Sequence, residues 1–165
     1  MSRWRTAVLA VLSGLLVPVA SARADFTLYE SDFGSGTIHK ITQDGTVTPF
    51  VTALQGPLGL AFDKAGNLYE ADGYSGSIYK IAPDGILTPA VIGLGAPSGL
   101  AFDKDGNLFE ADGYTGVVNE LTPYGVLTPF VTGLATPTGL AFDKAGNLYV
   151  SDPDPFTNLI YKITP

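Results

Sequence analysis

The chain has 165 residues, no cysteine, one histidine and a formal net charge of −7. This length suits one ordinary domain with its own hydrophobic core. The excess of acidic residues disfavours nucleic acids and anionic membrane surfaces as partners, because both are bound chiefly through lysine and arginine. Without cysteine the chain has neither a thiol nucleophile nor a thiolate metal site.

The first 24 residues have the layout of a secretory signal peptide. Two arginines precede an apolar stretch at residues 7–20, and Ala22-Arg23-Ala24 forms a small-residue cleavage motif. The apolar stretch is too short for a membrane anchor, which needs about 20 apolar residues. We therefore expect a secreted or periplasmic mature chain, 25–165, with no membrane span. That chain would contain six lysines against 16 acidic residues.

One sequence unit of about 40 residues recurs along the whole mature chain. Residues 59–98 and 99–138 are identical at most positions without a gap, and residues 25–58 and 139–165 contain parts of the same unit. Repetition at this period is typical of architectures in which each repeat packs against its neighbours. We therefore expect residues 25–165 to form one repeat domain without a linker.

Each complete unit is predicted to contain four short strands separated by tight turns. In residues 99–138 the strands are expected at 99–103, 108–112, 117–121 and 126–131, with glycine in every turn. The fourth strand contains Pro129, which cannot donate a ladder hydrogen bond, so this strand should be the outer edge of its sheet. Four strands in about 40 residues predict one blade of a β-propeller.

The repeated motif P-x-G-L-A-F-D-x-x-G-N-L-Y-x-A-D, followed by I-x-K-I, resembles the NHL repeat. It is also similar to the blades of the senescence-marker/gluconolactonase family and of streptogramin lyases, whose I-T-P-x-G-x-x-T-x-F motif matches residues 41–50 and 121–130. The resemblance implies an all-β, partial β-propeller of about four blades. Their approximate bounds are 25–58, 59–98, 99–138 and 139–165, and the first and last should be incomplete, which gives about 14 strands.

The resemblance also implies a ring of six or seven blades, which four blades do not close. A truncated propeller, a homo-oligomer that completes the ring and a compact four-bladed ring remain as alternatives. An open arc exposes two apolar sheet faces, and hiding roughly 400 Å² on each is worth on the order of 10 kcal/mol per face. We therefore favour association or truncation over closure by the monomer.

The loops between the second and third strands place an acidic and an aromatic residue of each blade on one face of the molecule. The set comprises Asp32, Phe33, Asp72, Tyr74, Asp112, Tyr114, Asp152, Asp154 and Phe156. Acidic and aromatic side chains in a ring predict a binding site for a sugar, a cation or an extended peptide. The structural alternative is that each aspartate bonds its own turn.

Three glutamates interrupt the second strands where the fourth copy has Val150. They are Glu30, Glu70 and Glu110. If their carboxylates converge near the central channel they would suit Ca²⁺, which prefers several oxygen ligands. The alternative is pairing with lysines of the next strand, Lys40 with Glu30 and Lys80 with Glu70.

Catalytic motifs are scarce in this chain. His39 has no catalytic partner in the sequence, and neither a nucleophile elbow nor a phosphate-binding glycine loop is present. The resemblance to the lactonases implies a metal held near the channel, but the asparagines of the repeated turn (Asn67, Asn107 and Asn147) are expected on the opposite face, so the ligands cannot be assigned residue by residue. We therefore expect an exported module that binds a protein or a small neutral or cationic ligand, rather than an enzyme. The alternative is a metal-dependent lactonase-type hydrolase or a streptogramin-type lyase.

Overall fold

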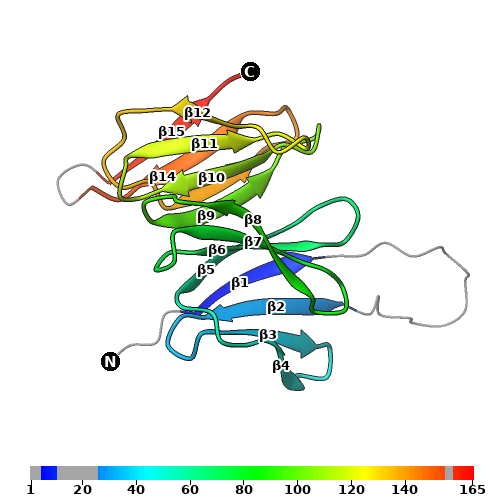
Figure 1. The fold of residues 1–165 in the computed structure, drawn as a ribbon. Helices are drawn as coiled ribbons and strands as arrows, with labels where there is room; N and C mark the ends of the chain where they lie inside the picture. Colours follow the sequence, from blue (N-terminus) through cyan, green and yellow to red (C-terminus); the bar gives the residue numbers. More distant parts are fainter. Residues whose placement is uncertain (1–4, 11–25, 155–157) are drawn as a thin grey trace, which may run out of the picture.

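The computed structural model describes residues 5–10, 26–154 and 158–165, which form four antiparallel sheets (Figure 1). The first sheet contains β1 (Arg5–Ala10), β2 (Thr27–Asp32), β3 (Thr37–Thr42) and β4 (Val47–Val51). The second contains β5 (Pro57–Phe62), β6 (Leu68–Asp72), β7 (Ser77–Ile81) and β8 (Leu87–Ile92). The third contains β9 (Pro97–Phe102), β10 (Leu108–Asp112), β11 (Val117–Leu121) and β12 (Leu127–Val131). The fourth contains β13 (Gly139–Phe142), β14 (Leu148–Asp152) and β15 (Leu159–Ile163).

The order of strands within the sheets confirms the expected unit. In every sheet the strands lie side by side in chain order, and each proline-containing fourth strand is at an edge. The sheets follow one another from blue and cyan to orange and red in Figure 1. The described part of the chain contains no helix, and hence none long and apolar enough to cross a bilayer.

The first sheet has four strands, whereas the sequence predicted three. Residues 5–10 form β1 and pair with β2, with Arg5 opposite Asp32 and Ala10 opposite Thr27. This segment lies within the predicted signal peptide and lacks the Gly-Leu-Ala-Phe motif of the later first strands, so the repeat pattern did not reveal it. The other residues of that peptide, 1–4 and 11–24, lie outside the described residues.

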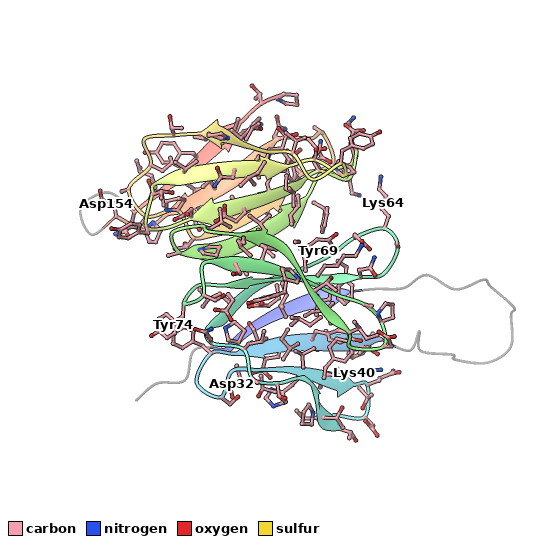
Figure 2. The ribbon with its side chains drawn as sticks, viewed as in Figure 1. Asp32, Lys40, Lys64, Tyr69, Tyr74 and Asp154 are labelled. Carbon is pink, nitrogen blue, oxygen red and sulfur yellow. The ribbon has the colours of Figure 1, made fainter. Side chains whose placement is uncertain are left out.

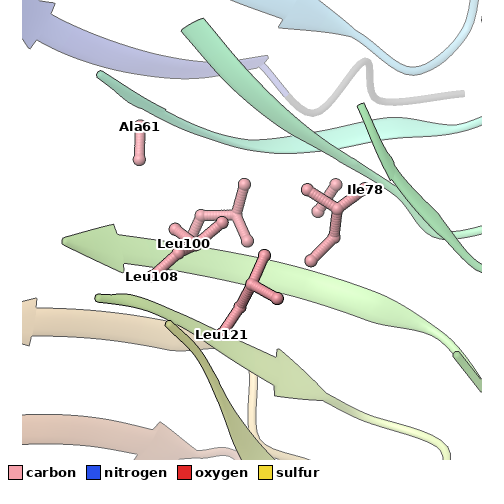
Figure 3. Packing of buried hydrophobic residues seen from close by; sticks show 6 residues of the cluster. Ala61, Ile78, Leu100, Leu108 and Leu121 are labelled. Atoms are coloured by element: carbon pink, nitrogen blue, oxygen red, sulfur yellow. The ribbon is translucent and has the colours of Figure 1, made fainter. Parts of the chain in front are cut away.

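Buried apolar side chains fill the space between successive sheets. Between the second and third sheets, Ala61 and Ile78 contribute to a cluster with Leu100, Leu108 and Leu121 (Figure 3). Similar clusters join the first sheet to the second and the third to the fourth. Each Å² of apolar surface that is buried stabilises the folded state by about 25 cal/mol, so these interfaces are the main source of stability.

An aromatic pair accompanies each of these interfaces. The edge-to-face pairs are Tyr29–Phe62, Tyr69–Phe102 and Phe109–Phe142, with ring centroids 5.3, 5.1 and 5.0 Å apart. In each pair the second strand of one sheet contacts the first strand of the next. The repeat of 40 residues therefore recurs in space as a repeated contact between sheets.

Glycine lets the first strands of neighbouring sheets approach closely. A Cβ atom at Gly59 would clash with the carbonyl oxygen of Ser98, and one at Gly99 would clash with that of Thr138. The main chains of β5, β9 and β13 are therefore in direct contact along the inner side of the stack, where a side chain has no room.

Candidate functional site

The aspartate that ends each second strand is held by backbone amides. Asp72 accepts hydrogen bonds from Tyr74 and Ser75 of its own turn at 3.2 and 2.9 Å. It also accepts them from Gln55 and Gly56, in the linker from the preceding sheet, at 2.8 and 3.1 Å. These bonds tie the turn after the second strand to the linker between the sheets, so both lie on the same face of the molecule.

Asp112 repeats this arrangement one sheet later. Its carboxylate accepts amides of Tyr114 and Thr115 at 3.0 Å and those of Gly95 and Ala96 at 2.7 and 3.0 Å. Burial acts to raise the pKa of this carboxyl group, but the amide hydrogen bonds outweigh it and hold the pKa below its usual value. The same balance lowers the pKa of Asp72. Both groups are ionised and engaged by the main chain at neutral pH.

Backbone amides also donate to the aspartates that end the second strands of the first and fourth sheets. Asp32 accepts the amide of Gly34 at 3.0 Å, and Asp152 accepts the amides of Ala135 and Thr136 at 2.9 and 2.6 Å. The main chain of Asp154 continues this turn, since its N–H donates to the carbonyl of Asp152 at 2.9 Å. Phe156 lies outside the described residues.

The aromatic residues after these aspartates are exposed on the same face. Phe33, Tyr74 and Tyr114 have 37%, 71% and 82% of their surface accessible, and we call this set the aromatic loop face. The rings of Phe33 and Tyr74, from neighbouring sheets, lie edge to face with centroids 4.9 Å apart. Figure 2 shows Asp32, Tyr74 and Asp154 along one side of the stack and Lys40 and Lys64 toward the opposite side.

Linker glycines support the two tyrosines. A Cβ at Gly56 would lie 3.1 Å from Cγ of Tyr74, and one at Gly95 would lie 3.0 Å from Cδ1 of Tyr114. Each tyrosine ring therefore rests against linker backbone that the neighbouring aspartate also holds. The arrangement presents aromatic surface on a fixed main chain, and it leaves the aspartates committed to structure.

A cavity of about 420 Å³ lies between the outer parts of the first and second sheets. Residues 50–55, Asp72, Tyr79, Gly85 and Leu87 line it. It adjoins the aromatic loop face through Gln55 and Asp72. This cavity could not be predicted from the sequence, because its walls come from strands and a linker of two different repeats.

The glutamates of the second strands lie on different sheet faces. Leu68 belongs to the apolar cluster shared with the first sheet, so alternation along β6 directs Glu70 toward the first sheet as well. By the same reasoning, Glu110 faces the second sheet, and Val150 occupies the equivalent place toward the third. Glu30 lies on the side of β2 away from the second sheet. The three carboxyl groups therefore belong to three separate sheet faces.

Glu70 is fully buried, and neither of its carboxylate oxygens has a hydrogen-bond partner. Burial, followed by the nearby charge of Asp72, raises its pKa to about 9. Burial also raises the pKa of Glu110 to about 7, although its Oε2 accepts a 2.9 Å hydrogen bond from Nδ2 of Asn119. Glu70 is consequently neutral at pH 7.

The predicted pairing of Lys80 with Glu70 is wrong. The register places Lys80 opposite Tyr69 and Glu70 opposite Tyr79. Lys80 lies 3.9 Å from Asp63 and over the ring of Tyr69, 5.7 Å from its centroid. Because side chains alternate along a strand, a shift of one position puts the lysine and the glutamate on opposite faces of the sheet.

Among the residues that the structure describes, no three acidic or histidine side chains are arranged to hold a metal ion. A calcium site formed by Glu30, Glu70 and Glu110 stays a prediction, to which this geometry adds no support. His39 lies opposite Glu30 across β2 and β3.

Several solved structures are similar to this fold. A gluconolactonase from Xanthomonas campestris matches with a TM-score of 0.74 and 26% identity, over 82% of this chain and 53% of that one. Virginiamycin B lyase from Staphylococcus aureus matches with a TM-score of 0.72 and 14% identity, over 99% and 57% of the two chains. A chain of the nidogen/laminin complex matches with a TM-score of 0.70 and 26% identity, over 76% and 53%. The fold is that of a β-propeller.

The four sheets are therefore propeller blades, and the resemblance noted in the repeat motif is confirmed for the fold. No protein-family model and no curated protein matches the sequence. The chain spans about half the length of the solved propellers that it matches. In this partial propeller the aromatic loop face lies where the turns after the second strands meet the linkers between blades.

Proposed function

We propose that the chain is an exported propeller module that binds a protein or a small ligand through the aromatic loop face. The observation that carries the proposal is the exposure of three aromatic rings on adjacent blades, two of which rest on linker glycines. The aspartates beside them, which the sequence placed in the ligand site, act in this proposal by fixing the loops.

Aromatic side chains on a fixed backbone suit molecular recognition. They have few rotatable bonds, so they lose little conformational entropy on binding, and their faces stack on sugars and on apolar parts of peptides. The six lysines and 16 acidic residues of 25–165 favour a neutral or cationic ligand over an anionic one. The match to a chain of the nidogen/laminin complex supports a protein ligand.

Substitution of the exposed tyrosines tests this proposal. A panel of neutral oligosaccharides and a cationic peptide library would be screened against the whole chain, and the hits measured by titration with Tyr74→Ala and Tyr114→Ala. Each substitution should weaken binding at least tenfold. Tyr124→Ala is the matched control, because Tyr124 is exposed in the turn between β11 and β12. Equal binding by all variants would refute the aromatic loop face as the ligand site.

Export is part of the proposal and rests on the signal-like residues 1–24. Cleavage after Ala24 would remove β1 and expose the edge of β2 with which it pairs. Intact mass measurement of protein recovered from the periplasm of an expression host should show Asp25 as the first residue. A folded periplasmic protein that retains residues 1–24 would contradict this part. Sedimentation velocity of the same sample tests whether two copies associate to complete the ring.

The matches to a gluconolactonase and to a streptogramin lyase favour a second candidate, an enzyme of lactonase or lyase type. This candidate requires turnover of a lactone or of a streptogramin, and for the lactonase type a bound metal. If a metal site exists, millimolar Ca²⁺ or Mg²⁺ should raise the melting temperature, because a ligand stabilises the state that binds it. An unchanged melting temperature together with no turnover would eliminate the enzyme.

A further inference from the structure

The cavity between the first and second blades has the size of a small-molecule site. Its volume of about 420 Å³ lies within the range of roughly 300–1,000 Å³ that is typical of ligand pockets. Its walls come from β4, from the linker at residues 52–55, from the end of β6 and from β7 and β8. The cavity is therefore a space between two blades that neither blade forms alone.

One side of the cavity is apolar and held in place. The ring of Phe50 lies edge to face with that of Tyr29, with centroids 5.0 Å apart, and a Cβ atom at Gly85 would lie 3.8 Å from Cε2 of Phe50. Leu54 and Leu87 also line the cavity, and both pack, like Phe50, against the apolar cluster between the two blades. These side chains offer a fixed surface to the nonpolar part of a ligand.

Asp72 forms the polar end of the cavity. Its Oδ1 accepts three of its four amide hydrogen bonds, whereas its Oδ2 accepts one, from Gln55 at 2.8 Å. A carboxylate oxygen has two lone pairs, so Oδ2 keeps one acceptor position beyond its bonds to the described residues. Asp72 is only 1% exposed. A negative charge that water barely reaches attracts a positively charged hydrogen-bond donor strongly.

A second carboxyl group lies behind this wall. Glu70 is two positions from Asp72 on the same face of β6, and it lies opposite Tyr79, which lines the cavity. Glu70 is fully buried, and no described residue offers its carboxyl oxygens a hydrogen bond. The cavity therefore borders buried acidic groups that lack donors, and a ligand with several N–H donors complements this region.

The side chains that give the cavity its chemistry do not belong to the common blade pattern. One repeat later, the equivalent positions carry smaller residues. The equivalent pairs are Phe50 and Ala90, Gln55 and Gly95, and Tyr79 and Asn119. An apolar cluster joins the second and third blades without these larger side chains. Blade stacking therefore does not require them, which leaves them available for a ligand.

We propose that this cavity binds a small primary ammonium compound with an apolar or aromatic body. The ammonium group would donate to Oδ2 of Asp72, and the body would pack against Phe50 and its leucine neighbours. The rings of Phe50 and Tyr79 add to the attraction, because aromatic faces are electronegative and favour a cation. This site is separate from the aromatic loop face, and the inference does not rest on that proposal.

Two probes of equal size isolate the charge. Benzylammonium and benzyl alcohol share one ring and one methylene group and differ in the terminal group. Each would be titrated into the ¹⁵N-labelled whole chain and followed in ¹H–¹⁵N correlation spectra. We expect saturable shifts at the amides of residues 52–55, with benzylammonium bound at least fivefold more tightly. Equal affinities, no saturation at millimolar probe, or shifts confined to the turns of Tyr74 and Tyr114 would overturn the proposal.

Removal of the charge of Asp72 should abolish the preference between the probes. Asp72→Asn should weaken binding of benzylammonium at least tenfold and change that of benzyl alcohol less than threefold. The retained affinity for the alcohol would show that the cavity is intact in the variant. A variant that binds the alcohol and still prefers the ammonium compound as strongly as the wild type would contradict the role of Asp72.

Substitutions taken from the next blade test the apolar wall without introducing a residue foreign to the fold. Phe50→Ala and Tyr79→Asn copy Ala90 and Asn119, and each should weaken both probes at least fivefold. Phe130→Ala is the matched control, because Phe130 holds the equivalent position of the third blade and packs edge to face on Phe109. It should change either affinity less than twofold. Unaltered binding by Phe50→Ala and Tyr79→Asn would overturn the proposal even if Asp72→Asn does not fold.

Discussion

The interface between the first and second blades and the one between the third and fourth carry chemically different residues at one equivalent buried position. The first buries Glu70, whose oxygens have no hydrogen-bond partner, and the second buries Val150 in an apolar cluster. Both interfaces keep an edge-to-face aromatic pair at the same place, Tyr29–Phe62 and Phe109–Phe142. Glu70 lies opposite Leu60 as Val150 lies opposite Leu140. The comparison shows that the same kind of blade interface accommodates either a buried carboxyl group or a valine at this position.

The pH dependence of stability should separate the two interfaces most strongly. Glu70 has a folded pKa of about 9 against an ordinary value of 4.5. Its protonated form therefore contributes fully to the free energy of unfolding below pH 4.5, and this contribution is lost as the pH rises toward 9. The free energy of unfolding should fall by up to about 1.4 kcal/mol per pH unit in that window. Urea denaturation of the wild type and Glu70→Val at pH 5, 7 and 9 measures this. A variant whose curve falls as steeply as that of the wild type would contradict the assignment to Glu70.

Placing an acid in the apolar interface should give the next largest effect. Val150→Glu puts a carboxyl group at a fully buried position of an apolar cluster, where Tyr161 rather than an asparagine lies opposite. Burying such a group without a partner costs about 3 kcal/mol at pH 7. Chemical denaturation provides the measurement, and Val150→Ala controls for lost volume. A loss no greater than that of the alanine variant would show that this interface also accommodates the acid.

Removal of the Glu110 partner should have an intermediate effect. Asn119→Ala leaves Oε2 of Glu110 without its hydrogen bond, at a cost of about 1–2 kcal/mol. The loss should be larger at pH 8 than at pH 5, because the bond from Asn119 opposes the rise in the pKa of Glu110 and favours its ionised form. Thermal melting at the two pH values tests this. The same loss at both would place the effect in packing alone.

Substitutions in the linkers between blades should change the stability of the protein least. Ala53 has a φ of 67°, whereas Gly93 and Gly133 occupy the same conformation in the next two linkers. A Cβ at either glycine meets no atom within 4 Å, so conformation alone distinguishes the residues. Ala53→Gly should therefore stabilise the protein by about 1 kcal/mol, and Gly93→Ala should destabilise it by a similar amount. Calorimetric melting temperatures that move in the opposite directions would refute this reading of the linker.

Much of the fold could be predicted because the repeat carries local signals. Period-two alternation, the turn glycines and the fourth-strand proline indicated the strands of each later blade and which strand lies at the edge. Arg5–Ala10 carries none of these signals, so β1 could not be found from the repeat. The pairing of Lys80 failed because register is a property of two strands, and the sequence of either one does not determine it.

The candidate site was predictable only in part. The sequence placed the aspartates and aromatic residues on one face, since each follows the same strand. It did not show that Asp72 also binds the linker amides of Gln55 and Gly56, contacts that join residues 16 and 17 positions apart. Nor did it show that Phe33 and Tyr74 meet, because they belong to different blades and only tertiary packing brings them together.

The glycine contacts along the inner strands have a consequence for the design of longer arrays of these blades. Main-chain atoms of Gly59 and Gly99 set how closely neighbouring units approach, whatever side chains stand elsewhere. Tandem duplication of residues 59–98 should therefore add blades at an unchanged spacing. An alanine at either glycine should force the two blades that meet there apart, because its Cβ atom would clash with the backbone of the next blade.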